Sequence, residues 1–162
     1  MTIIEILRWL HVIGATVLLG TGAGIAFFML MAHRTRNPAM IAHTAGVVVI
    51  ADVIFTASAV IVQPVTGVLL AWRTGWSLQE GWLALSIGLF ILTGLCWLPV
   101  VWIQIRMRDL AHDALRNGRA LPAEYHRLFR RWVALGIPAF ISVLVIVWLM
   151  LNKPAIPLFA VS

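Results

Sequence analysis

Four long apolar segments, separated by short polar ones, constrain this chain more than any other feature of its sequence. They lie at about residues 3–32, 45–72, 81–105 and 132–151. Each is at least as long as the roughly 20 predominantly apolar residues that an α-helix needs to cross a bilayer. The sequence therefore predicts an all-α integral membrane four-helix bundle, a single domain over residues 1–162 whose main partner is the lipid bilayer.

The composition supports this class of protein. Hydrophobic residues make up 62% of the chain and charged residues only 11%, with a mean hydropathy of +0.98. A soluble domain is about half apolar and about a quarter charged, and so short a chain cannot hide the excess apolar surface in a core. The single cysteine, Cys96, excludes an internal disulfide and a metal site built from cysteine pairs.

The placement of basic residues predicts an orientation in the membrane. Two of the connecting segments carry most of them, namely Arg34, Arg36, Arg106, Arg108, Arg116, Arg119, Arg127, Arg130 and Arg131. The opposite side has only Arg8, Arg73 and Lys153. The positive-inside rule then places both termini outside and the basic loops in the cytoplasm. We expect a multi-pass protein of the bacterial inner (plasma) membrane.

The basic segment between the third and fourth spans is predicted to be helical. The helix of the third span should continue through Leu115 and break at Asn117–Gly118, and Pro122 suits the first turn of a new helix. On that helix, Arg127, Arg130 and Arg131 are candidates to bind anionic headgroups, at about 1 kcal/mol each. The alternative is that they only orient the protein. Either way, the net charge of +6 indicates a membrane rather than nucleic acid as the partner.

Three polar side chains from different spans are predicted to lie at one depth. At about 1.5 Å per helical residue, His11 lies about 12 Å below the start of the first span. Gln63 lies about 13 Å from the end of the second span and Ser86 about 9 Å from the start of the third. Thr66 is close to the same level. Because polar groups in lipid face the bundle interior, these residues are candidates for a cofactor-binding site.

His11 has two interpretations that the residues leave open. In the first, it is a neutral histidine whose ring hydrogen-bonds Gln63 or a backbone carbonyl. In the second, its free ring nitrogen ligates a haem iron or another metal. No second histidine occurs at a matching depth, so a bis-histidine haem has no second ligand. The nearby glycines should allow close helix contact, including the GxxxG pair Gly20 and Gly24.

Asp52 is the only acidic residue well inside a span. It is a candidate for an ion pair with Arg34 or Arg106, or for a polar pocket with Gln104. Without such a partner it would be protonated or functional, and a proton-handling role is the alternative interpretation.

Four stretches of this chain match a known pattern: LHVIGATVLLGTGAGIAFFMLMAHRTR, ADVIFTASAVIVQPVTGVLLAW, GWLALSIGLFILTGLCWLPVVWIQIRMRDL and LPAEYHRLFRRW. Through them the chain resembles the predicted integral membrane proteins of the domain-of-unknown-function 2269 family. The resemblance covers most of the sequence. It implies a membrane protein and no particular activity.

The stretch LHVIG, which contains His11, is also distantly similar to two other groups. These are the haem-binding, membrane-embedded protoporphyrinogen oxidases of the HemJ type and the copper-resistance protein D group. The resemblance implies b-type haem as a cofactor, with His11 as its axial ligand. In the third span of the oxidases, Gly-Trp-Leu precedes a histidine and a lysine, whereas Ala84 and Ser86 stand at those positions here. This departure leaves a five-coordinate haem on His11, or a site rebuilt with Gln63.

Three functions are therefore compatible with the sequence. The first is a redox protein that binds b-type haem through His11. The second is a non-catalytic accessory or assembly subunit of a larger membrane complex, which the small size favours. The sequence leaves open whether the chain also forms a homo-oligomer. The third is a small metal or proton transporter built round Asp52. No nucleophile–base pair, phosphate loop or paired carboxylates occur, which argues against a hydrolase or a kinase and leaves enzymatic activity open.

Overall fold

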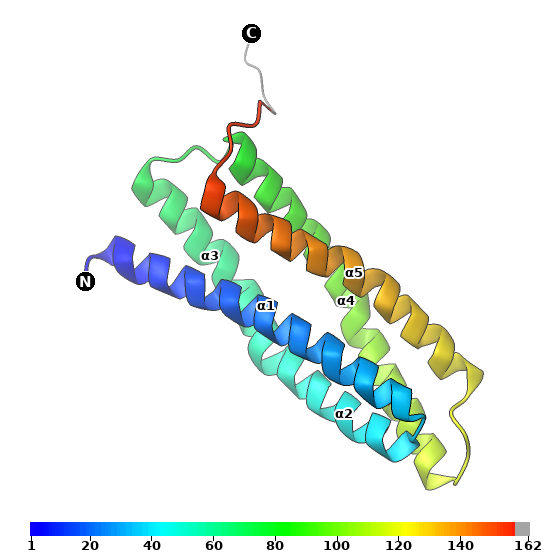
Figure 1. The fold of residues 1–162 in the computed structure, drawn as a ribbon. Helices are drawn as coiled ribbons and strands as arrows, with labels where there is room; N and C mark the ends of the chain where they lie inside the picture. The colour runs from blue at the N-terminus through cyan, green and yellow to red at the C-terminus, as the bar shows by residue number, and fades with distance from the viewer. Residues whose placement is uncertain (158–162) are drawn as a thin grey trace.

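The computed structural model describes residues 1–157, which fold into long helices joined by short turns (Figure 1). The elements are α1 (Ile3–Thr35), α2 (Pro38–Ala51), the π-helical turn η1 (Asp52–Thr56), α3 (Ala57–Thr74), α4 (Gly81–Arg116) and α5 (Ala123–Asn152). Because α2, η1 and α3 follow one another without a break, they form one rod, Pro38–Thr74. We refer to this continuous helix and to α1, α4 and α5 as the four rods. Each of them is long and apolar enough to cross a membrane. The predicted all-α class with four spans is confirmed.

Local signals explain where the first two rods begin. Thr2 and Glu5 form a capping box at α1, in which the backbone N–H of Thr2 donates to Glu5 Oε2 at 2.8 Å. Asn37 caps α2 by accepting from the backbone N–H of Ala39 at 2.9 Å, and Pro38 occupies the first helical position. The second rod therefore begins at Pro38, ahead of the apolar span that it contains.

The predicted helical arm after the third span is confirmed. α4 continues to Arg116, and the chain turns through Asn117 and Gly118. Gly118 has a φ of 59°, in the left-handed region that glycine adopts without a steric penalty. After Pro122, α5 runs from Ala123 to Asn152 as one helix. The 36 residues of α4 extend over about 54 Å, which is longer than the hydrocarbon layer of about 30 Å.

The rods pack unevenly along their length. α4 packs along α5 and on α2, whereas α1 packs on α2 and α3. We call the end with the α1–α2 and α4–α5 turns the basic end, and the end where α1 begins and α5 ends the terminal end (Figure 1). The main apolar core includes the fully buried Met29, Ile41, Met107 and Tyr125 from all four rods and lies toward the basic end. A smaller cluster closes the terminal end, formed by Ala71, Trp82, Leu83 and Leu149.

The outside of the bundle is largely apolar, whereas several polar side chains within the spans lie inside. Ile61, Leu95 and Leu98 are 67%, 64% and 63% exposed, and they belong to a large set of exposed apolar side chains. At roughly 25 cal/mol per Å² of apolar surface, contact with water on this scale is unfavourable, and lipid removes that cost. The buried polar residues are Asp52, Thr56, Gln63, Thr66, Ser86, Gln104 and Ser142.

Candidate functional site

His11 lies where α1 and α3 meet in the terminal half of the bundle. Its Nδ1 is 2.9 Å from Thr66 Oγ1. Gln63 Nε2 donates a hydrogen bond of 2.8 Å to the backbone carbonyl oxygen of His11. Gln63 and Thr66 are both buried and lie on one face of α3, because residues three apart on a helix are neighbours. The structure therefore brings these three sequence-predicted residues together.

The hydrogen bonds of Thr66 determine which ring nitrogen of His11 carries the proton. Thr66 Oγ1 donates its only hydrogen to the backbone oxygen of Val62, at 2.7 Å. Since that hydrogen is used, the oxygen accepts from His11, so Nδ1 is the protonated nitrogen of the neutral ring. Nε2 then carries the free lone pair, which is the form in which histidine binds a metal. No hydrogen bond within residues 1–157 reaches this Nε2.

Two glycines allow α1 and α3 to approach this closely. A Cβ at Gly14 would lie 3.0 Å from Gln63 Nε2, and one at Gly67 would lie 3.2 Å from His11 Cε1. By contrast, a Cβ at Gly20 would meet no atom within 4 Å, and one at Gly24 would meet only Phe28 of its own helix. The close helix contact expected from the GxxxG pair is therefore made by Gly14 and Gly67 instead.

The hydroxyl of Ser86 forms its hydrogen bond within its own helix. Its Oγ donates to the backbone oxygen of Trp82 at 2.7 Å, and the residue is 2% exposed. α4 packs on α5 and α2, whereas the neighbour of His11 is α3. In the part of the chain that the structure describes, no hydrogen bond joins Ser86 to His11, Gln63 or Thr66.

Asp52 lies in the middle of its rod, at the start of the π-helical turn η1. Its side chain is 3% exposed, and its Oδ1 accepts a hydrogen bond of 3.3 Å from Trp97 Nε1. Its Oδ2 has no hydrogen-bond partner among the described residues. Neither arginine considered from the sequence pairs with it there, and Arg106 instead bonds Glu124 at 2.9 Å. Sequence reasoning did not find the contact with Trp97 or the π-helical turn, because no residue pattern in this stretch indicates either.

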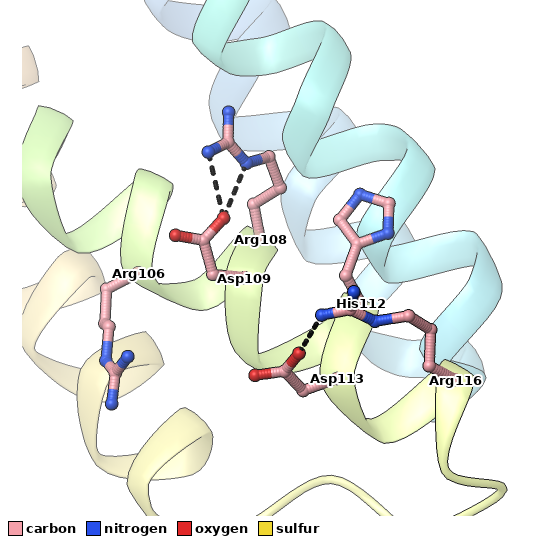
Figure 2. Close-up of a pocket in the computed structure, with 6 residues that line it drawn as sticks. All are labelled: Arg106, Arg108, Asp109, His112, Asp113 and Arg116. Atoms are coloured by element: carbon pink, nitrogen blue, oxygen red, sulfur yellow. Dashed lines mark hydrogen bonds and ion pairs between the residues drawn. The ribbon is translucent and has the colours of Figure 1, made fainter.

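A set of charged groups surrounds an open groove on α4 at the basic end (Figure 2): Arg106, Arg108, Asp109, His112, Asp113 and Arg116. Arg108 pairs with Asp109 at 2.9 Å, and Arg116 pairs with Asp113 one turn earlier. Arg106 points away from these pairs (Figure 2). It bonds Glu124 of α5. Each arginine of the groove therefore has its own carboxylate, and the ion pair with Glu124 joins α4 to α5.

The same end of the molecule joins α1 to α5 through an aromatic contact. The ring of His33 stacks on Phe129 with a centroid distance of 3.6 Å and an interplanar angle of 5°. His33 Nδ1 also lies 3.2 Å from the hydroxyl of the fully buried Tyr125. On the opposite side of α5, the side chains of Arg127, Arg130 and Arg131 are exposed.

The His11 site presents one side chain of a type that commonly ligates metals, His11 itself. Within residues 1–157, no three histidine, cysteine, aspartate or glutamate side chains gather closely enough to hold a metal ion. His11 Nε2 is therefore the one nitrogen donor that this site offers.

Four long apolar rods with polar groups inside and apolar side chains outside define a multi-pass integral membrane protein. The chain belongs to the family described as predicted integral membrane protein (DUF2269), whose model matches residues 5–154. The membership expected from the sequence is confirmed. No curated protein and no solved structure matches the chain.

Proposed function

We propose that this protein is a membrane redox protein that binds one b-type haem, with His11 Nε2 as the axial ligand of the iron. The observation that supports this proposal is the hydrogen bond between His11 Nδ1 and Thr66, since Thr66 already donates to Val62. A histidine that ligates a metal through one nitrogen usually donates its other N–H to a fixed acceptor. When bound, haem supplies one-electron transfer.

The residues on α4 support one protein ligand rather than two. Ala84 has no donor atom, and the hydroxyl of Ser86 is bonded to the backbone of Trp82. The proposal is therefore a five-coordinate haem. Thr66 is a positioning residue that fixes the ring of His11, and Gln63 is a positioning residue that holds the backbone of α1 against α3.

An absorption spectrum tests this proposal directly. The protein is expressed in haem-replete cells, purified in detergent and compared with His11→Ala and with His112→Ala, a matched control whose histidine is exposed at the basic end. We expect a Soret band in the wild type and in His112→Ala, and its loss in His11→Ala. A wild-type protein without a Soret band, or a band of equal intensity in His11→Ala, would contradict the proposal.

We also propose that the basic end faces the cytoplasm of a bacterial inner membrane, with both termini outside. The distribution of basic residues supports this orientation, because the terminal end has only Arg8, Arg73 and Lys153. Cys96 is buried, so a new surface cysteine gives a clean labelling signal. In intact spheroplasts an impermeant maleimide should label Ser77→Cys, in the α3–α4 turn, and should label Arg119→Cys only after permeabilisation. The reverse pattern would overturn this orientation.

A further inference from the structure

Asp52 is a buried acidic side chain within the second rod. It lies about 21 Å along its rod from Pro38 and about 33 Å from Thr74, at about 1.5 Å per residue. Its side chain is 3% exposed. The proposed haem site does not use it, because His11 contacts Thr66 and Gln63 at the terminal half of the same rod.

No charged side chain on the rods that pack here is available to pair with Asp52. The nearest titratable or charged groups along each rod are His11 and His33 on α1, His43 and Arg73 on its own rod, Glu80, Cys96 and Arg106 on α4, and Arg131 and Lys153 on α5. Only the thiol of Cys96 lies at a similar depth, next to Trp97 in the chain. Arg106 belongs to the ion pair with Glu124. The carboxyl group of Asp52 therefore has no counter-charge within the spans.

The one hydrogen bond that Asp52 receives does not compensate a negative charge. Trp97 Nε1 is a neutral donor, and its distance of 3.3 Å from Oδ1 exceeds the usual range for an N–H···O bond. A carboxylate without a partner in an apolar surrounding is far less favourable than the neutral acid. Oδ2 has no hydrogen-bond partner among the described residues, so no donor there stabilises a negative charge.

Two further buried side-chain oxygens share the lack of a partner seen at Asp52 Oδ2. Thr56 Oγ1 and Gln104 Oε1 have no hydrogen-bond partner among the described residues. Thr56 lies one turn from Asp52 at the other end of η1, and Gln104 lies two turns from Trp97 on α4. π-Helical turns inside longer helices occur frequently at functional sites, and this one begins at Asp52 itself.

We infer that Asp52, with Trp97, forms a proton-binding site inside the membrane, occupied by an exchangeable proton on Oδ2. The bound species is a proton rather than a metal cation. A hard cation requires several oxygen ligands, whereas Trp97 presents an N–H donor to one of the two carboxyl oxygens. Acidic groups of this kind form the proton relays of membrane proteins.

Infrared spectroscopy of the protein in lipid vesicles tests this inference. The chain has six acidic residues, and Asp52 is the buried one. At neutral pH we expect a carbonyl band of a protonated carboxylic acid that shifts in D₂O. Asp52→Asn should remove this band, and the matched control Asp109→Asn, at the basic end, should keep it. The inference is overturned by a wild type without the band, by a band that does not shift in D₂O, or by a band that survives in Asp52→Asn.

A second variant keeps the test decisive if Asp52→Asn does not fold. Trp97→Phe removes the hydrogen bond to the carbonyl oxygen, so the band should persist and move to higher frequency. An unmoved band in Trp97→Phe would show that the protonated acid is not Asp52. His11→Ala should leave the band unchanged, so that the loss of haem and the loss of the proton site are separate results.

Discussion

At the residue scale, the hydroxyl of Thr66 is central to the His11 site because it forms hydrogen bonds to both α3 and α1. It donates to Val62 within α3 and accepts from His11 on α1. A hydroxyl with its hydrogen already used can only accept, so it selects one tautomer of the imidazole. A threonine that forms a hydrogen bond to the preceding turn of its own helix thereby controls the chemistry of a residue on another helix.

Thr66→Val tests this control of the His11 ring. Valine has the shape of threonine without the oxygen, so the helix contact is kept and the acceptor for Nδ1 is lost. We expect haem affinity to fall by about 10-fold to 100-fold, the range found when the partner of a metal-bound histidine is removed. Haem titration of the detergent-purified protein measures the change, and Thr66→Ser should retain most of the affinity. Equal affinity in Thr66→Val would show that Thr66 does not position the ring.

At the element scale, the contact between α1 and α3 depends on a glycine that no motif marks. Gly14 faces the amide of Gln63, whereas Gly22 is one of the glycines of α1 with open space around it. Gly14→Ala should move the Gln63 amide from the carbonyl of His11 and lower the free energy of unfolding by about 1–2 kcal/mol. The matched control Gly22→Ala has the same change in helix propensity and should not be destabilised. Denaturant unfolding in detergent compares the two, and equal stability would contradict the contact.

The sequence predicted the bounds of the helices but not which helices pack together. The lengths of the apolar runs predicted the four spans, and the break at Asn117–Gly118 predicted the end of α4. Depth along a helix placed His11 and Gln63 at one level, but depth does not determine which helices are neighbours. Ser86 lies at a similar predicted depth, but its hydroxyl bonds the backbone of Trp82 in its own helix. The rotation of each helix about its own axis and the choice of its neighbours depend on the packing of whole helices. No local pattern in a single sequence indicates them.

At the scale of the whole molecule, the polar and apolar groups divide the bundle into parts with different tasks. The main apolar core and the ion pair between Arg106 and Glu124 hold the basic end together. His11, Gln63 and Thr66 lie in the terminal half of the bundle, and Asp52 lies at the edge of the main core, next to Ala51. The ion pairs of the basic end and the buried polar groups of the spans therefore lie at different levels of the bundle.

Replacement of the exposed arginines of α5 tests whether they bind anionic lipid headgroups or only orient the chain in the membrane. Arg127, Arg130 and Arg131 belong to none of the ion pairs within residues 1–157, so their replacement by glutamine leaves the fold intact. The remaining basic residues at this end keep the orientation. At about 1 kcal/mol for each arginine, the triple variant should retain an anionic phospholipid about 100-fold more weakly. Native mass spectrometry with phosphatidylglycerol measures this, with Arg8→Gln at the terminal end as the control. Unchanged retention in the triple variant would show that these arginines serve only to orient the chain.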